Sequence, residues 1–160
     1  MHNLKTVSLA VVMFFCNESA LAIEARIQQM QAVFFGNVIT RIGSCEMDPI
    51  SGAISSPENI CIGTETLGHY RIFGDPGELQ VIKFNQVMDN SRGLHFAPKA
   101  RLVNNLGDDM LAPIAGIETY INIGSDGIID IYLGGTLTFN QAQSSNSPIV
   151  IFYDIDFSTP

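Results

Sequence analysis

The chain contains no tryptophan and is short of positive charge. Its 160 residues include 8 Lys and Arg against 16 Asp and Glu, which gives a formal net charge of −8 at pH 7. An electrostatic field of this sign repels phosphate backbones, so nucleic acid is not expected as a partner. The missing tryptophan weakens the case for a carbohydrate-stacking platform without excluding one.

Long hydrophobic runs are also scarce, and the N-terminal run Thr6–Cys16 is too short to span the roughly 30 Å of hydrocarbon in a bilayer. It follows a short positive segment, Met1–Lys5, and precedes Ala20–Ala22, which has the small-x-small pattern of a cleavage site. These three parts predict a secretory signal peptide over residues 1–22, cleaved after Ala22.

The alternative is a retained membrane anchor, or a lipoprotein attached through Cys16. The bulky segment Met13–Phe15 stands where small residues would precede a lipid-attached cysteine, so cleavage is favoured. Residues 23–160 then form one exported domain, in the periplasm, on the cell surface or outside the cell. No later segment is long and apolar enough for a membrane span, so none is expected after cleavage.

Cysteine is scarce as well, and only Cys45 and Cys61 follow the predicted signal peptide. In an oxidising compartment such a pair is expected to form a disulfide. Closing the intervening loop would stabilise the fold by about 3 kcal/mol in the chain-entropy model. A zinc site would need two further ligands, and His69 and His95 are isolated and show no ligand spacing. We therefore expect neither a metal nor another cofactor.

Helical periodicity is nearly absent after the signal segment, where short apolar alternations are separated by Gly and Pro turns. The clearest alternations, 117–123 and 129–133, flank Gly124–Gly127, which is expected to be a hairpin loop. Strands that recur about every ten residues predict an all-β, two-sheet sandwich of roughly eight strands. The remaining expected strands are 37–47, 53–62, 67–73, 79–88, 94–103 and 149–157.

Residues 23–33 carry two competing patterns. Ile23, Ile27 and Met30 recur at helical steps, whereas Ile23, Ala25 and Ile27 alternate as in a strand. We favour the extended form, because everything downstream is β.

No constellation of side chains indicates catalysis. Nucleophilic hydrolysis needs a Ser or Cys beside a base, but no Gly-x-Ser-x-Gly motif occurs and the histidines have no evident partner. Asp126 and Asp130 are the least implausible residues for a hydrolase. Asp154 and Asp156 lie two apart on a strand and are expected to form a solvated stripe. The protein is therefore expected not to be an enzyme, with no catalytic residues.

Four stretches carry a family resemblance: Phe34–Val38, Met47–Gly52, Tyr70–Gly77 and Leu133–Phe139. Their motifs are an apolar-Phe-Gly strand, an Asp-Pro-x-x-Gly turn, a strand that ends in Gly-Asp-Pro-Gly, and a Gly-Gly-x-Leu strand. This combination resembles a family of small exported bacterial proteins classed only as a domain of unknown function. That family is similar in turn to chaperone–usher pilus subunits and spore-coat-U-like pilins. The resemblance implies an immunoglobulin-like sandwich, no known enzyme activity and export to the surface.

The resemblance also implies a structural subunit of a pilus- or fimbria-like assembly, with a periplasmic chaperone, an usher and sister subunits as partners. Such subunits carry an N-terminal donor segment that completes the neighbouring subunit by strand addition. Ile23, Ala25 and Ile27 are the candidates here, but Gln29 and Gln31 interrupt the dry face. The segment is either a short donor strand or part of the domain, as in a tip or non-polymerising member.

A second hypothesis is a self-contained adhesive or ligand-binding module of the cell surface. The loops Asp48–Gly52, Gly74–Glu78 and Ser144–Pro148 would present its binding site. This hypothesis predicts a stable monomer, whereas the structural-subunit hypothesis predicts strand-swapped multimers.

Overall fold

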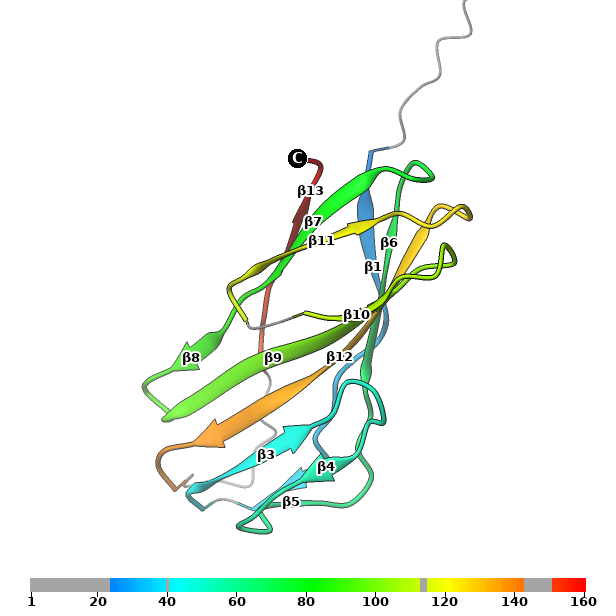
Figure 1. The fold of residues 1–160 in the computed structure, drawn as a ribbon. Helices are drawn as coiled ribbons and strands as arrows, with labels where there is room; N and C mark the ends of the chain where they lie inside the picture. Colours follow the sequence, from blue (N-terminus) through cyan, green and yellow to red (C-terminus); the bar gives the residue numbers. More distant parts are fainter. Residues whose placement is uncertain (1–23, 40, 113–114, 143–150) are drawn as a thin grey trace, which may run out of the picture.

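The computed structural model describes residues 24–39, 41–112, 115–142 and 151–160 (Figure 1). The predicted signal peptide lies outside these ranges. Within them the chain forms strands and no helix, which confirms the expected all-β class. None of the described residues belongs to a helix that is long and apolar enough to cross a membrane. The strands are β1 (Arg26–Gln31), β2 (Asn37–Val38), β3 (Gly43–Met47), β4 (Ile54–Ser55), β5 (Cys61–Ile62), β6 (Gly68–Phe73), β7 (Leu79–Phe84), β8 (Val87–Asp89), β9 (Leu94–Val103), β10 (Asp109–Leu111), β11 (Glu118–Asn122), β12 (Ile128–Phe139) and β13 (Ile155–Ser158).

The strands form two antiparallel sheets and one short ribbon. In the larger sheet β1, β6, β12, β3 and β4 follow in order, and β9 also pairs with β12 and carries β8 and β10. The second sheet consists of β11, β7 and β13, and the ribbon of β2 and β5. In the upper half of Figure 1 the second sheet packs over the larger one around a shared apolar core, which confirms the expected sandwich.

The central strand of the larger sheet, β12, changes partner along its length. Residues Ile128–Leu133 pair with β6, and Gly135–Phe139 pair with β3. Gly134 and Gly135 lie at this change, and a Cβ on either one would come within 2.4 Å of a backbone oxygen on a neighbouring strand. Glycine therefore permits the close approach of three strands at this point, which explains the Gly-Gly pair of the sequence.

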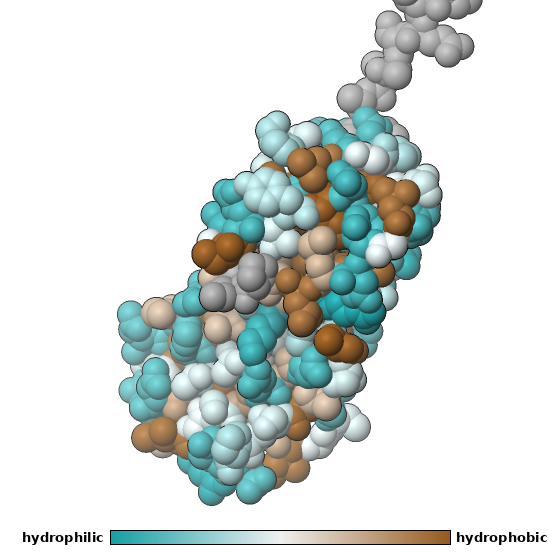
Figure 2. Space-filling view, in the orientation of Figure 1, coloured by the Kyte–Doolittle hydropathy of each residue, from teal (hydrophilic) through white to brown (hydrophobic). Residues whose placement is uncertain are grey.

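Buried apolar side chains form two clusters, one in each half of the molecule, whereas on the surface drawn in Figure 2 apolar residues are scattered among polar ones. The upper cluster lies between the two sheets, and the lower cluster lies under β3, β9 and the end of β12. Tyr153 packs against both clusters and so connects them. The upper cluster consists of Tyr70, Ile72, Ile82, Phe84, Ala100, Leu102, Ala112, Ile121, Ile123, Ile129, Ile131 and Leu133. The lower cluster consists of Phe35, Cys45, Met47, Ile60, Leu94, Phe96, Leu137 and Phe139.

The expected disulfide is present between Cys45 in β3 and Cys61 in β5, with a Cα–Cα distance of 6.1 Å. It ties the β2–β5 ribbon to the larger sheet, and its Cys45 end is fully buried in the lower cluster. The bond therefore fastens the piece of chain that covers the lower core.

The strands expected over 37–47 and 79–88 are each divided in two, into β2 and β3 and into β7 and β8. The strand expected over 53–62 is also wrong as a continuous element, because it is divided into β4 and β5. Ser56 causes the division. Its hydroxyl donates to Ser44 O at 3.0 Å and accepts from the Ile60 N–H at 2.9 Å, which folds the intervening residues into a turn. Asn59 in this turn has a positive φ of 51°, a conformation that asparagine tolerates better than most residues.

The hairpin expected around Gly124–Gly127 is also wrong in one respect. The turn itself forms, with Gly127 at φ 79° and its N–H bonded to Gly124 O at 2.9 Å. The two flanking strands do not pair, however, because β11 joins the second sheet and β12 the larger one. The turn is therefore a connection between sheets.

Candidate functional site

One side of the sandwich ends in two strands with free edges. Among the described strands β1 pairs only with β6, and β13 pairs only with β7. The chain that leads into β13 lies over β6, because the hydroxyl of Tyr153, two residues before β13, is hydrogen-bonded to the hydroxyl of Tyr70 in β6. Both free-edged strands thus belong to the β6 side of the molecule, which we call the open side.

Apolar side chains on the open side are only partly covered. Ile27 lies opposite Ile72 in the β1–β6 pair and packs against the edge of the upper cluster. Ile155 and Phe157 in β13 also pack there and remain partly exposed. A strand added along this side would cover these side chains and gain main-chain hydrogen bonds.

Three positions were predicted as a donor segment, and the structure places two of them. Ile27 lies within β1, and Ala25 is half-buried just before that strand. Ile23 lies outside the described residues. The extended form expected for this segment is confirmed by β1, and a register shift between Gln29 and Gln31 places Gln31 opposite His69.

The free edge of β13 has identifiable backbone groups. The Asn85 N–H donates to Asp154 O at 3.2 Å, which marks these two residues as a hydrogen-bonded pair. Because bonded and non-bonded pairs alternate in antiparallel strands, the N–H groups of Asp156 and Ser158 face β7. The N–H groups of Ile155 and Phe157 then face away from β7 and are available to another strand.

A polar network covers the outer face of the larger sheet. His69 Nε2 and Arg71 Nε lie 2.6 and 2.8 Å from the same oxygen, Asp130 Oδ1. Burial raises the pKa of Asp130, but the hydrogen bonds from Arg71 and His69 outweigh it and hold that pKa below its ordinary value. The carboxylate is thus ionised and fully engaged with two neighbours.

Planar groups stack beside this network on three adjacent strands. The rings of His69 and Tyr132 are parallel within 9°, with centroids 5.0 Å apart. The Arg101 guanidinium lies 6.0 Å from the centroid of the Tyr132 ring, and it also bonds Asp109 at 2.7 and 2.6 Å. The ring faces are used against one another, so this stack stiffens the sheet and does not offer a free platform to a ligand.

The residues suggested for a hydrolase have structural contacts in the described chain. Asp126 Oδ1 accepts from the Ile128 N–H at 3.2 Å within the turn, and Asp130 is bonded to His69 and Arg71. Within the described ranges, the side-chain partners of His69 and His95 are Asp130 and Gln86, and neither is a nucleophile. Asp154, just before β13, and Asp156, within it, are both exposed, which confirms the predicted solvated stripe.

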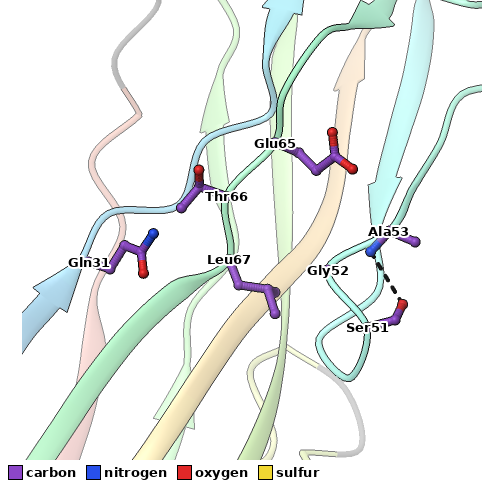
Figure 3. A pocket seen from close by; sticks show the side chains of 7 residues that line it. All are labelled: Gln31, Ser51, Gly52, Ala53, Glu65, Thr66 and Leu67. Carbon is purple, nitrogen blue, oxygen red and sulfur yellow. Dashed lines mark hydrogen bonds between the residues drawn. The ribbon is translucent and has the colours of Figure 1, made fainter.

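A shallow hollow of about 460 Å³ lies between the end of β1, the turn after β3 and the segment before β6 (Figure 3). The side chains of Gln31 and Glu65 at this hollow make no hydrogen bond or ion pair in the described structure. Ser51 lies on the opposite wall, where its hydroxyl accepts from the Ala53 N–H at 3.2 Å. Leu67 supplies an apolar contact. This mixture suits a hydroxyl-bearing ligand, and it includes part of the predicted loop Asp48–Gly52.

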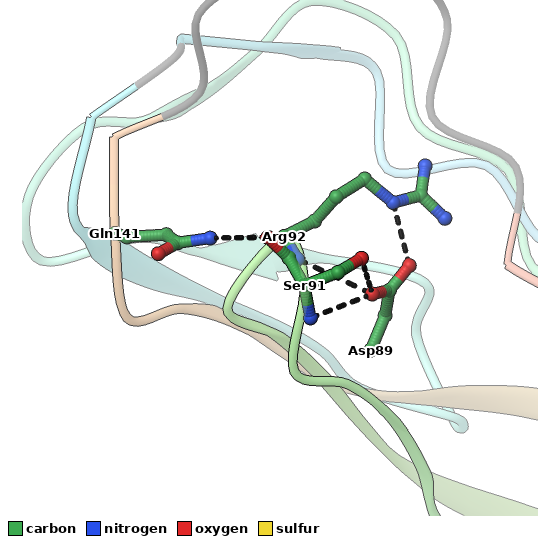
Figure 4. Close-up of polar contacts among 4 residues, drawn as sticks. All are labelled: Asp89, Ser91, Arg92 and Gln141. Carbon is green, nitrogen blue, oxygen red and sulfur yellow. Dashed lines mark hydrogen bonds and ion pairs between the residues drawn. The ribbon is translucent and has the colours of Figure 1, made fainter.

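The loop between β8 and β9 is held by one carboxylate (Figure 4). Asp89 accepts from the Ser91 hydroxyl at 2.6 Å and from Arg92 Nε at 2.6 Å. These hydrogen bonds lower the pKa of Asp89 to about 2. Gln141, from the chain after β12, donates to Ser91 O at 2.9 Å and ties the loop to the end of the larger sheet.

No local sequence pattern predicts the contacts that shape these surfaces. His69 and Asp130 are 61 residues apart, and only the register of β6 against β12 brings them together. Gln31 and Glu65 likewise meet at the hollow through chain pairing that no local pattern encodes. The predicted loop Gly74–Glu78 is part of the described chain, whereas Ser144–Pro148 lies outside it.

In the described ranges no three His, Cys, Asp or Glu side chains form a group that could hold a metal ion. Comparison of the protein with protein-family models, with curated proteins and with solved structures finds no match.

Proposed function

We propose that the protein is an exported, non-enzymatic structural subunit of a pilus- or fimbria-like surface assembly. The open side carries this proposal. Among the described strands, β1 and β13 each end a sheet there with one free edge, and partly covered apolar side chains lie between them. Exposed strand edges have unpaired N–H and C=O groups, which soluble proteins normally protect from pairing with other chains. A free edge beside the core therefore supports the addition of a strand from a partner protein.

The added strand comes from the N-terminal segment of a neighbouring subunit, with Ile23, Ala25 and Ile27 as its apolar row. In the described chain Ile27 packs in its own domain, so donation requires β1 to leave β6 and pair with the next copy. The donated strand lies along the free edge of β13 in the next copy, where the outward N–H groups of Ile155 and Phe157 gain main-chain hydrogen bonds. A periplasmic chaperone and an usher would cover the open side before assembly.

Amide hydrogen exchange tests this proposal residue by residue. The N–H groups of Ile155 and Phe157 face away from β7, so they exchange rapidly in a monomer and become protected in the assembly. The Asp156 amide faces β7 and serves as an internal control, protected in both states. Multimers in which Ile155 and Phe157 still exchange rapidly would show that another surface makes the contact. A stable monomer that never assembles would refute the structural role.

The hollow beside Gln31 and Glu65 favours a second function, that of an adhesive module for a neutral saccharide. Carboxylate and amide groups bind hydroxyls, and Leu67 offers contact to the apolar face of a sugar. Saturation-transfer NMR with lactose, maltose and chitobiose tests this function. We expect saturable binding that Gln31→Ala abolishes and that Gln28→Ala, on the same strand and away from the hollow, leaves intact. Absence of binding to all three sugars would contradict it.

A further inference from the structure

The hollow in Figure 3 and the open side share one structural element, β1. Gln31, the last residue of β1, forms part of the wall of the hollow. The rest of that wall comes from the turn after β3 and from the segment before β6. Strand donation at the open side takes β1 away from β6, so it also takes Gln31 away from the hollow.

Few side-chain contacts hold β1 in its own domain. Five of its six residues are exposed, and Ile27 is half-buried. The Arg26 guanidinium lies 5.1 Å from the centroid of the Phe73 ring and adds one further contact. The pairing with β6 is interrupted by the register shift between Gln29 and Gln31. The strand therefore depends mainly on main-chain hydrogen bonds, and one added contact changes how often it leaves β6.

The chain just beyond β1 is fixed, so the donated segment ends beside the hollow. The Phe34 N–H donates to Thr66 O and the Thr66 N–H donates to Phe34 O, both at 2.8 Å. Phe35 is buried in the lower cluster. Departure of β1 thus leaves Thr66 in place, and the boundary lies between Gln31 and Phe34. The hollow has one wall on the donated segment and its other walls, including Ser51, on the fixed domain.

We propose that a ligand in the hollow and the donation of β1 exclude each other, so that the hollow is complete only in a copy that keeps its own β1. A ligand that contacts both Gln31 and Ser51 binds only while β1 is docked. By linkage, its binding opposes the release of β1 to the same extent. This inference rests on both proposed functions, because it needs a donated β1 and a ligand in the hollow.

The exclusion has a consequence for the assembly as a whole. In a linear assembly each copy donates β1 to the next, and the last copy has no acceptor for its own strand. That copy keeps β1 on β6 and therefore keeps the complete hollow. Ligand binding is thus confined to one end of the assembly, with one site whatever the number of copies.

A chemical cross-link tests the exclusion without any ligand. The variant Gln31→Cys/Glu65→Cys, joined by a flexible bis-maleimide, ties β1 to the fixed side of the hollow. Cys45 and Cys61 are bonded to each other and do not react. The control Ser51→Cys/Glu65→Cys places the same linker within the fixed domain. We expect the first linker to slow assembly by at least about tenfold relative to the unlinked variant, and the control linker to leave the rate unchanged.

The saccharides proposed for the hollow measure the exclusion directly. Lactose, maltose and chitobiose are each titrated into the monomer and into the assembly at equal chain concentration. We expect a sugar that binds one site per chain in the monomer to bind one site per assembly. At about ten times its dissociation constant, that sugar should slow assembly of the wild type by about tenfold. Gln31→Ala, which loses the sugar, should assemble at the same rate with and without it.

Two results would overturn the inference alone: equal sugar binding per chain in monomer and assembly, or unchanged assembly of the linked Gln31→Cys/Glu65→Cys variant. Failure of the proposed functions has other signatures. A protein that never assembles refutes the structural role, and a monomer that binds none of the three sugars contradicts the adhesive function. In either case the inference falls with the function on which it rests.

Discussion

The two halves of the protein cover their apolar cores in different ways. In the upper half a three-stranded sheet lies over the larger sheet and encloses a cluster with twelve buried side chains among the described residues. In the lower half the described chain has eight buried side chains in its cluster, covered by the short β2–β5 ribbon and by irregular chain. The disulfide between Cys45 and Cys61 lies in this lower half. A hydrogen-bonded sheet holds itself in place, whereas irregular chain over a core must be fastened by other means.

The difference in cover also explains where each half is open. The upper half has regular strands whose outer edges are free, so it is suited to pairing with another strand. The lower half has a hollow between loops and turns, so it is suited to contact with a small ligand. The two proposed functions therefore belong to different halves, and they can be tested independently.

The largest expected effect comes from the core of the upper half. Leu102 is fully buried between the sheets. Leu102→Ala should lower the free energy of unfolding by about 4 kcal/mol, because it removes buried apolar surface and leaves a cavity. Urea unfolding at neutral pH measures this loss. The matched control is Leu106→Ala, at a leucine that is 53% exposed, and it should change stability by less than about 0.5 kcal/mol. Equal losses in the two variants would refute the assignment of the upper core.

Reduction of the disulfide should have the next largest effect and should act on the lower half. We expect a loss of about 3 kcal/mol in the free energy of unfolding, from the added freedom of the unfolded chain. Amide exchange should accelerate first in the β2–β5 ribbon, while β6 and β7 retain their protection. The Cys45→Ser/Cys61→Ser variant is the control, since reductant should leave its stability unchanged. Uniform acceleration across both halves would show that the bond does not act locally.

Sequence patterns predicted the upper half better than the lower. Alternating apolar residues located β6 and β9 because each has one buried face and one more exposed face. The same rule failed over 53–62, where the Ser56 hydroxyl competes with strand pairing for backbone groups. It also missed β10, which has only three residues and no alternation to detect.

Sites were harder to predict than strands, because they depend on which strands become neighbours. The disulfide was predictable, since the two cysteines that follow the predicted signal peptide have only one possible pairing. The pair of His69 with Asp130 depends on the register of β6 and β12. Gln80 Oε1 is buried without a hydrogen-bond partner in the described structure, which depends on the donors that the surrounding strands place near it. Local sequence encodes the faces of a strand but contains no information about its partner.

Removal of one hydroxyl should weaken the cover of the lower half by a smaller amount. Ser56 makes hydrogen bonds to Ser44 O and to the Ile60 N–H, and it is only partly exposed. Ser56→Ala should lower the free energy of unfolding by about 1 to 2 kcal/mol, because these buried backbone groups lose their partner. Ser55→Ala is a close control, at an exposed neighbouring serine. Equal effects of the two variants in urea unfolding would show that the turn does not depend on the Ser56 hydroxyl.

The smallest expected effect is the acid response of the β8–β9 loop, which closes the lower half at the end of β12. The pKa of Asp89 is about 2 in the folded protein, against an ordinary value of 3.8. A carboxylate with a depressed folded pKa adds stability above its unfolded pKa and loses it as pH falls through the folded value. Asp89→Asn should therefore lower the urea midpoint at pH 6, and the difference from wild type should shrink between about pH 4 and pH 2. Asp154→Asn, at an exposed carboxylate without side-chain hydrogen bonds, should show no such convergence. A difference at Asp89 that stays constant with pH would mean that the charge of this carboxylate does not hold the loop, whereas no difference at any pH would mean that the loop is held by its backbone alone.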